Sequence, residues 1–556
     1  MESVCTLRTI ATAAAAGLTT PAIDAQDFTT NHSAGPRPGG TKLATSTSKS
    51  ILAFACASAL LLVAALPARS QETVLYSFTG GNDGGQSYSS LTEHNGNFFG
   101  ATEFGGVLGY GVVFELSPNG SGGWTETVLH EFTLAADGGF PHSTLTFDSA
   151  GNLYGTAVSG GESPSCPDEI CSGVVFELSP TGTSWTETVL YSFTGGADGG
   201  FPQSGPIMDS AGNLYGTTYN SDGGAGSVFE LSPSANGWTE KEIYTVNAST
   251  AEGMYAGLTM DAAGNMYGST GAEIFELSPN GSGGWSPTVI HTFVSGTSDG
   301  FDAEGTLVLD KTGNLYGTTE WGGANATGTV YELSHASGSW TEKILYSFSK
   351  SPEGQGTHPW GGVIFDAAGN LYGTTTSGGL SSTFCQYNCG TVFELVAPAS
   401  GGSYQEKVLF EFNYLDGENP VASLVMDSAG KLYGTTESGG PGEIGINGLV
   451  FELNPSAAST ETELASSANP SKSAQAVTFT AVVTSSVGVP PNGETVSFMK
   501  GATLLGTGTL NDGSASFSTS SLAVGTDAVT AMYAGDANFL ASTSNTVEQV
   551  VNKAAK

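Results

Sequence analysis

Basic residues are scarce in this chain: lysine and arginine together number 15 of 556 residues, against 52 aspartates and glutamates. The resulting net charge of −37 excludes nucleic acid as the expected partner, because phosphate backbones bind basic surfaces. Charged residues amount to only 12%, whereas glycine reaches 80 residues. Abundant glycine without a triplet period, with many Thr, Ser, Tyr and Phe, favours short strands joined by turns. For an extracellular protein, the simplest interpretation of the acidity is solubility.

An apolar run at Ile51–Leu66 has the features of a secretory signal. Lysines precede it, and the small residues of Ala68–Ser70 suit a cleavage site, so we predict a signal peptide at 49–70 with Gln71 as the mature start. The alternative is an uncleaved membrane anchor, which is the one membrane contact that we expect. Residues 1–48 are a disordered leader or an over-extended gene start. The protein is therefore expected to be secreted or held at the cell surface.

Cysteine is rare, with six residues in the chain. Two of them fall in the predicted leader and signal segments. The other four form two close pairs, Cys166 with Cys171 and Cys385 with Cys389, which in an exported protein predict two local disulfides. A four-cysteine metal site would require the two distant pairs to meet, so no metal site is expected here.

One nine-residue stretch, Asp148-Ser-Ala-Gly-Asn-Leu-Tyr-Gly-Thr156, organises the chain because it recurs. The copies are about 56 residues apart, and a period of that length marks a repeat architecture. The further copies are Asp209–Thr217, Asp261–Ser269, Asp310–Thr318, Asp366–Thr374 and Asp427–Thr435, with a degraded first copy at 95–102.

Each repeat contains four short segments rich in β-branched and aromatic residues and bounded by Gly, Pro, Asn or Asp, which is the pattern of strands. In one repeat they are Ser143–Asp148, Asn152–Thr156, Val174–Leu178 and Trp185–Phe193. No sustained helical period interrupts them. Four strands in each of seven units predict an all-β fold with a seven-bladed β-propeller at 71–455.

The strand count also predicts how the ring closes. The first copy of the fourth strand, Thr73–Phe78, stands before the first full unit, and the last unit stops after its third strand at Leu453. The N-terminal strand can therefore complete the final blade, which leaves no unpaired edge between the first and last blades. An open solenoid of the same repeats is the alternative.

Residues that recur with the repeat are interpreted as scaffold. Five of the seven tryptophans begin fourth strands, and a glutamate recurs once per third strand. The aspartate of the Asp-x-x-Gly-Asn turn is expected to cap its own hairpin by accepting bonds from nearby amides. We therefore expect no cofactor, with calcium bound by aspartates as the alternative.

Long and variable connections lie on one face of the predicted propeller, and binding usually resides in such loops on a rigid frame. A recurrent Asp-Gly motif in these loops is either a glycine-dependent turn or part of a ring of carboxylates and aromatics that binds a polyhydroxylated ligand or a cation. Residues that break the repeat are better candidates for chemistry, and none of them has metal-ligand spacing or accompanies a nucleophile motif. The candidate ligand-binding residues are Asp137, Phe140, His142, Asp198, Phe201, Asp299, Phe301, Trp321, His358 and Trp360, and no catalytic residue is proposed.

The chain changes character after Leu453. Residues 456–468 are rich in Ser, Thr, Ala and Glu and are expected to form a linker. Four alternating segments then follow within 469–552 and predict one Ig-like β-sandwich. The segment Tyr533-Ala-Gly-Asp-Ala-Asn-Phe539 closely resembles bacterial Ig-like domains of group 3.

The repeats themselves, with Gly-Asn-Leu-Tyr-Gly-Thr-Thr and Val-Phe-Glu-Leu, resemble the Gloeobacter–Verrucomicrobia ("GloVer") tandem repeat of exported bacterial proteins. This resemblance implies a location and an architecture but transfers no catalytic residue. The sequence therefore favours a non-enzymatic binding or adhesion protein, with an extracellular polysaccharide or another surface protein as its partner. The alternatives are a secreted propeller enzyme acting on carbohydrate or a lactone, and a structural envelope protein.

Overall fold

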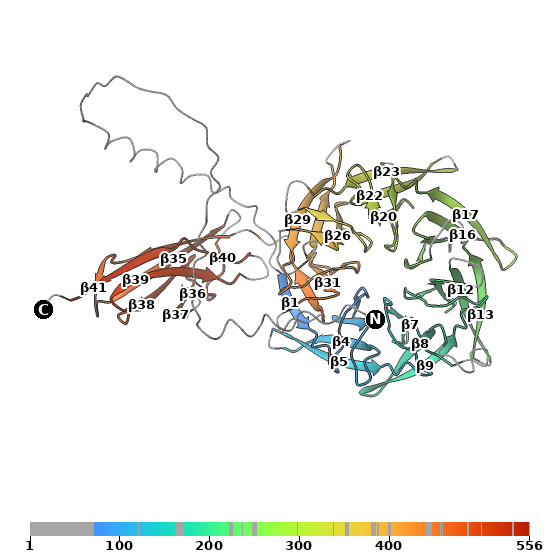
Figure 1. Cartoon of the computed structure of the whole chain (residues 1–556), viewed down its shortest axis with the longest axis horizontal. Coiled ribbons are helices and arrows are strands. Elements are labelled where there is room, and N and C mark those ends of the chain that lie inside the picture. The colour runs from blue at the N-terminus through green and yellow to red at the C-terminus, as the bar shows by residue number, and fades with distance from the viewer. Residues whose placement is uncertain are drawn as a thin grey trace, which may run out of the picture. The chain divides into compact units, whose positions relative to one another are not determined.

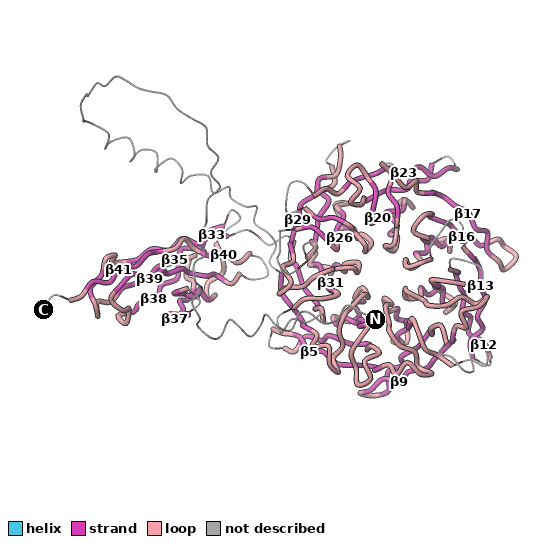
Figure 2. The backbone as a smooth tube through the Cα atoms, in the orientation of Figure 1, coloured by secondary structure: helices cyan, strands magenta, loops and turns pink. Residues whose placement is uncertain are grey.

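The protein is described here by a computed structural model (Figure 1). It describes residues 72–554 apart from 121, 163–170, 222–225, 236, 247–252, 297, 337, 351–354, 380–384, 386–388, 399–401, 441–446, 456–457, 459, 486–488, 502 and 536–538. The predicted leader 1–48 and signal peptide 49–70 lie outside these residues. The described part consists of strands and loops without a helix, which confirms the all-β prediction (Figure 2).

Seven antiparallel sheets of four strands each follow the repeat. The first sheet contains β2 (Thr92–His94), β3 (Asn97–Thr102), β4 (Val112–Pro118) and β5 (Trp124–Glu131). The second contains β6 (Thr146–Phe147), β7 (Leu153–Ala157), β8 (Val174–Thr181) and β9 (Ser184–Ser192). The third contains β10 (Ile207–Met208), β11 (Leu214–Thr218), β12 (Ser227–Ser234) and β13 (Gly237–Thr245). The fourth sheet contains β14 (Thr259–Met260), β15 (Met266–Ser269), β16 (Glu273–Pro279) and β17 (Trp285–Thr292). The fifth contains β19 (Val308–Leu309), β20 (Leu315–Thr319), β22 (Thr329–Ala336) and β23 (Ser339–Ser347). The sixth contains β25 (Ile364–Phe365), β26 (Leu371–Thr375), β28 (Thr391–Val396) and β29 (Gln405–Glu411). Two-residue strands pair in the connections, β18 (Gly300–Phe301) with β21 (Trp321–Gly322) and β24 (Gly356–Thr357) with β27 (Ser377–Gly378).

The seventh sheet joins the two ends of the repeat region. It runs in the order β1 (Glu72–Ser77), β32 (Leu449–Leu453), β31 (Leu432–Thr436) and β30 (Val425–Met426). The N-terminal strand thus pairs antiparallel with the last third strand, from Glu72 opposite Leu453 to Ser77 opposite Leu449, as the sequence predicts. Thr435 Oγ1 also donates to the carbonyl of Ser89 at 3.1 Å, which links the last repeat to the first. The sheets stand around a ring with their fourth strands, such as β5, β9 and β23, on the outside (Figure 1).

The Leu-Tyr-Gly-Thr segment of each second strand explains how neighbouring sheets pack. Its glycine lies over the ring of the third-strand aromatic: a Cβ on Gly373 would lie 2.6 Å from Cζ of Phe393. Its threonine donates across the junction, and Thr374 Oγ1 bonds the carbonyl of Ala422 in the next repeat at 3.2 Å. The motif therefore meets two packing requirements: the glycine leaves room for an aromatic ring within the sheet, and the threonine bonds the neighbouring repeat.

Replacing Gly373 with alanine is expected to destabilise the ring by about 1–3 kcal/mol, because the added methyl group overpacks a buried core. Phe393 is fully buried, so its ring cannot move into solvent. Thermal unfolding would show a lower Tm, and adding Phe393→Leu to the same chain should recover part of the loss. Equal Tm values for wild type and Gly373→Ala would contradict this account of the motif.

The recurrent aspartate caps the hairpin between the first and second strands, as the sequence indicates. Asp148 Oδ1 accepts bonds from the amides of Ala150 and Asn152, both at 2.8 Å, and Oδ2 accepts from Asn152 Nδ2 at 2.8 Å. The hydroxyl of Tyr154 completes the set at 3.3 Å. Burial raises the pKa of Asp148, but the hydrogen bonds from Asn152, Ala150 and Tyr154 together outweigh burial and hold the pKa below its usual value.

The tail forms two further sheets around one core that contains Phe479, Phe498 and Tyr533. One sheet has the order β33 (Thr460–Ser466), β35 (Val477–Ser485) and β38 (Ser514–Thr519). The other contains β34 (Ser471–Lys472), β41 (Val547–Asn552), β39 (Gly525–Tyr533), β36 (Thr495–Lys500), β37 (Thr503–Thr509) and β40 (Ser542–Thr543).

The linker expected at 456–468 needs a correction. Residues 460–466 form strand β33, whose Leu464 pairs with Ala481 of β35. The strand alternates as Thr-Glu-Thr-Glu-Leu and places Thr462 and Leu464 in the core while its glutamates face outward. The composition of this segment indicated a linker, but the alternation of outward-facing and buried residues with a period of two is the pattern of a strand.

Candidate functional site

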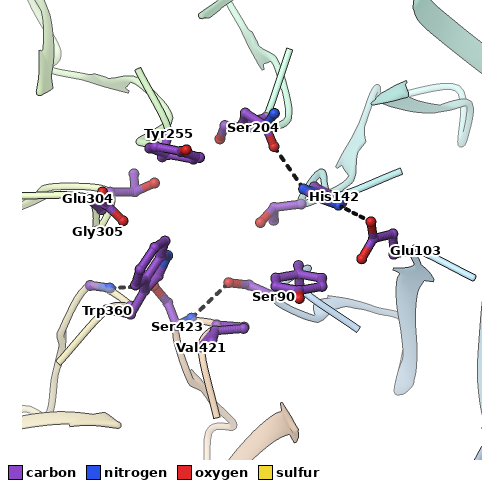
Figure 3. Close-up of a pocket in the computed structure, with 17 residues that line it drawn as sticks. Ser90, Glu103, His142, Ser204, Tyr255, Glu304, Gly305, Trp360, Val421 and Ser423 are labelled. Carbon is purple, nitrogen blue, oxygen red and sulfur yellow. Dashed lines mark hydrogen bonds and ion pairs between the residues drawn. The ribbon is translucent and has the colours of Figure 1, made fainter. Parts of the chain in front are cut away.

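A cavity of about 300 Å³ opens where the seven repeats converge (Figure 3). Each repeat contributes one side chain from the equivalent position, just before its first strand. We call these residues the pocket ring. They are Tyr88, His142, Gln203, Tyr255, Glu304, Trp360 and Val421.

The backbone explains why these side chains reach the cavity. Each lies six residues before the turn aspartate of its repeat, or before His94 in the first repeat. Two residues earlier the chain turns through a positive φ, for example 60° at Phe140 and 59° at His358. Such a conformation is strained for a residue with a side chain and persists only where the surrounding structure imposes it. The neighbours of His142, Pro141 and Ser143, are buried, so the ring residue is the one that faces the cavity.

Aromatic side chains form two parts of the wall. Tyr255 and Trp360 lie together with ring centroids 6.0 Å apart and planes at 69°, and Tyr255 is 37% exposed. In Figure 3 these two rings lie across the cavity from His142. Tyr88 stacks on His142 with centroids 4.7 Å apart. The cavity therefore offers apolar ring surface beside polar groups.

Hydrogen bonds between repeats fix the polar part of the ring. His142 Nδ1 and Gln203 Oε1 are 2.8 Å apart, and His142 Nε2 lies 3.4 Å from Glu103 Oε1. Tyr88 donates its hydroxyl to Glu437 at 2.7 Å. Glu103 and Glu437 follow the second strands of the preceding repeats, so each pair spans a junction. These contacts hold the side chains in fixed positions around the cavity.

The cavity carries carboxylates and no lysine or arginine among its lining residues, all of which are described. Glu103 and Glu304 line it together with the hydroxyls of five Ser and Thr residues, namely Ser90, Thr144, Ser204, Thr306 and Ser423. A phosphate, sulfate or uronate would meet negative charge here without a compensating cation. A neutral ligand rich in hydroxyls fits the lining better.

Two of the expected site residues, His142 and Trp360, line the cavity. Trp321 and His358 lie outside its lining and contact each other, with ring centroids 4.4 Å apart. His358 is buried, and burial with the nearby charge of Lys350 lowers its pKa. Phe301 pairs with Trp321 in the short β18–β21 ladder.

Phe140 and Phe201 occupy the positive-φ position, where they shape the backbone beside the ring residues. Phe140 also packs edge-on against Phe104 and Tyr110, with both centroid distances 5.6 Å. The two phenylalanines are absent from the cavity lining.

The expected aspartates Asp137, Asp198 and Asp299 sit in turns away from the cavity lining. Asp137 accepts from the amide of Thr133 at 2.9 Å and from its hydroxyl at 2.5 Å, and Asp198 does the same with Thr194. Asp299 accepts from the amide of Val294 at 3.0 Å. These contacts favour the interpretation of the Asp-Gly motif as a turn.

Each of these aspartates also faces a glutamate at the start of the next sheet's fourth strand. Burial, with the charge of Asp137 second, raises the pKa of Glu187 to about 7. The same cause acts on five equivalent residues. Burial raises the pKa of Glu126, Glu240, Glu342 and Glu406 to about 7 and that of Glu72 to about 8, with Asp83, Asp198, Asp299 and Asp416 adding to the effect at all but Glu406.

One predicted disulfide, Cys385–Cys389, is present, with its Cα atoms 5.3 Å apart. Cys171 is disulfide-bonded as well, and its expected partner Cys166 lies outside the described residues.

Sequence reasoning missed Tyr88, Gln203, Tyr255, Glu304 and Val421. The signal was present in the repeat alignment, since all seven ring residues occupy one column. That column holds Tyr, His, Gln, Tyr, Glu, Trp and Val, whereas the next column holds only Ser, Ala or Gly, and most repeats have leucine three residues on and aspartate six residues on. A variable column inside a regular repeat therefore marks the position that faces the cavity.

A family of known repeats matches the chain over residues 270–517. It is the Gloeobacter/Verrucomicrobia repeat. The match supports the repeat resemblance, and it extends into the tail strands as far as β38. No curated protein matches the chain.

Several solved structures resemble the chain at low identity. The extracellular domain of BT4673 from B. thetaiotaomicron is 10% identical over 86% of this chain and 59% of that one, with a TM-score of 0.43. The gluconolactonase XC5397 from Xanthomonas campestris is 13% identical over 70% and 92%, with a TM-score of 0.32. A family 43 arabinoxylan arabinofuranohydrolase from Bacillus subtilis is 13% identical over 81% and 93%, with a TM-score of 0.28. The chain thus spans about three fifths of the BT4673 structure, and none of these likenesses bears on ligand or reaction. No helix in the described ranges has the length and hydropathy to cross a bilayer.

Proposed function

We propose that this is an exported binding protein whose pocket ring holds a neutral, polyhydroxylated ligand, a segment of extracellular polysaccharide, without converting it. In this proposal the seven sheets are the blades of a β-propeller at 71–455, and the tail is an Ig-like sandwich that serves as a spacer. The signal segment directs the protein out of the cell, where it is secreted or stays at the surface.

The observation that carries the proposal is the composition of the pocket ring. Tyr255 and Trp360 give aromatic faces at an angle to each other, suited to the C–H faces of a pyranose. His142 and Gln203 provide polar atoms already held in place by their mutual bond of 2.8 Å. A rigid cavity with apolar walls and a few placed polar groups is typical of small-ligand sites.

The rival is a carbohydrate- or lactone-converting enzyme that uses Glu103 and Glu304. Glycoside hydrolysis requires one carboxyl group as acid and a second as base or nucleophile. Glu103 already pairs with His142 and takes part in the contacts that hold the ring together. The binding role is therefore the better supported of the two.

A glycan panel distinguishes the roles. The purified protein is incubated with neutral, uronate-containing and amino-sugar polysaccharides, and retention and released sugars are measured in the same wells. We expect retention of a neutral glycan, no retention of uronate-rich glycans and no released product. Product release would support the enzyme, and retention of only amino sugars would replace the neutral ligand by a cationic one.

A further inference from the structure

At the junction between the fourth and fifth four-stranded sheets, three side chains that can ligate a metal ion converge. His291 lies on β17, Asp299 follows that strand, and Glu342 lies on β23 of the next sheet. One ligand atom from each of the three lies within 4.8 Å of the other two. Among the described residues, this is the one group of three His, Cys, Asp or Glu side chains so placed.

A second observation concerns the same junction. Tyr331 is fully buried, and its hydroxyl has no hydrogen-bond partner among the described residues. The nearby carboxylates of Glu342 and Asp299, after burial, raise the pKa of Tyr331. The other six repeats carry phenylalanine at this position. A buried hydroxyl without a partner costs free energy, so its presence beside the carboxylates calls for a bonding partner.

The charges of the junction call for a cation as well. His291 Nε2 lies 3.8 Å from Asp299 Oδ1 and, like Glu342 Oε1, is a buried atom without a hydrogen-bond partner. Two adjacent carboxylates repel each other, and either a shared proton or a bound metal ion relieves that repulsion.

We propose that His291, Asp299 and Glu342 bind one divalent transition metal ion of the zinc type, with the Tyr331 hydroxyl bonded to a ligand oxygen. One imidazole and two carboxylates suit zinc, whose ligands lie about 2.0–2.2 Å from the ion. Two carboxylates also balance the charge of the ion. Small side-chain rotations close the remaining distance. Bound there, the ion joins two neighbouring sheets far from the pocket ring.

Zinc binding to the dialysed, untagged full-length protein tests the site. Titration against a chromogenic chelator, with Co²⁺ absorption as a second readout, should give one tight site per chain. Glu342→Gln should lower the zinc affinity at least 100-fold, and Tyr331→Phe about tenfold, as loss of a supporting contact does. Tyr331→Phe restores the residue of the other repeats and so keeps the fold.

Glu187→Gln is the matched control. Its junction has His130 and Asp137 in the equivalent places but Phe176 instead of tyrosine, and it does not bring three ligand atoms together. The control should bind zinc as the wild type does. Absence of a tight site in the wild type, unchanged affinity in Glu342→Gln, or an equal loss in Glu187→Gln would each overturn the proposal.

Discussion

Replacing Trp360 with alanine is expected to weaken binding of the retained glycan at least tenfold. The indole supplies the largest apolar surface of the pocket ring and supports Tyr255 across a centroid distance of 6.0 Å. Aromatic residues at the centre of a site commonly account for about 2 kcal/mol or more on truncation. Isothermal titration with a soluble oligosaccharide of the retained glycan measures the loss.

Trp321→Ala provides the control for this result. Trp321 is 39% exposed and lies outside the cavity lining, so its removal deletes an indole without touching the pocket ring. We expect its affinity to stay within about twofold of wild type. If Trp321→Ala lost as much affinity as Trp360→Ala, the ligand would bind in the loops and not in the cavity.

The second large effect is expected on stability against pH. In a buffer with chelator, the Tm should fall by about 5 °C between pH 6.0 and pH 8.5. The cause is the set of junction glutamates, whose pKa values are raised by burial to about 7, and to about 8 for Glu72. A glutamate whose pKa is higher in the folded than in the unfolded chain stabilises the fold below the unfolded pKa of 4.5. This stabilisation is lost as the pH rises through the folded pKa values of about 7 to 8.

Groups whose pKa is lower in the folded than in the unfolded chain have the opposite effect on stability: they destabilise the fold as the pH falls. Burial lowers the pKa of His130, His291 and His358, so these residues oppose folding as the pH falls through their unfolded value of 6.5. The turn aspartates, such as Asp148, lose their contribution as the pH falls below 3.8. The interval from pH 6.0 to 8.5 lies above the range of the aspartates, and the histidines offset the effect of the glutamates only at its lower end.

Glutamine variants test this assignment. Glu126→Gln combined with Glu187→Gln removes two of the titrating groups and should reduce the fall in Tm by about a third. A Tm that is constant or rises from pH 6.0 to 8.5 in the wild type would contradict the role of the junctions.

The scaffold could be predicted from the sequence because its requirements recur. Leu-Tyr-Gly-Thr repeats wherever a second strand must admit a third-strand aromatic ring and bond the next repeat, as Gly373 and Thr374 do. The turn aspartate recurs because each hairpin needs the same cap. One extra copy of the fourth strand, Thr73–Phe78, precedes the first repeat, and the last repeat lacks its own fourth strand. Because exposed strand edges tend to be paired, the sequence predicted that this copy closes the ring, as β1 does by pairing with β32.

The candidate site was predicted only in part. The prediction relied on residue types, namely aspartates, aromatic residues and histidines, whereas the cavity is lined by the same position of every repeat whatever its residue type. Asp137, Asp198 and Asp299 recur for the same reason as the caps: they hold turns. Tyr88 and Glu304 lie in unremarkable sequence, and only the convergence of seven connections at one cavity brings them together. Tyr331 differs from the phenylalanine of the other repeats by one hydroxyl group, and only the folded structure brings the charges of Glu342 and Asp299 to bear on it.

A crystal structure of the protein with the retained oligosaccharide tests the central claim most directly. We predict an intact sugar in the cavity, with one ring against Trp360 and Tyr255 and its hydroxyls bonded to His142, Gln203 or Glu304. A sugar bound outside the pocket ring would contradict the site, and a cleaved sugar within it would contradict the binding role.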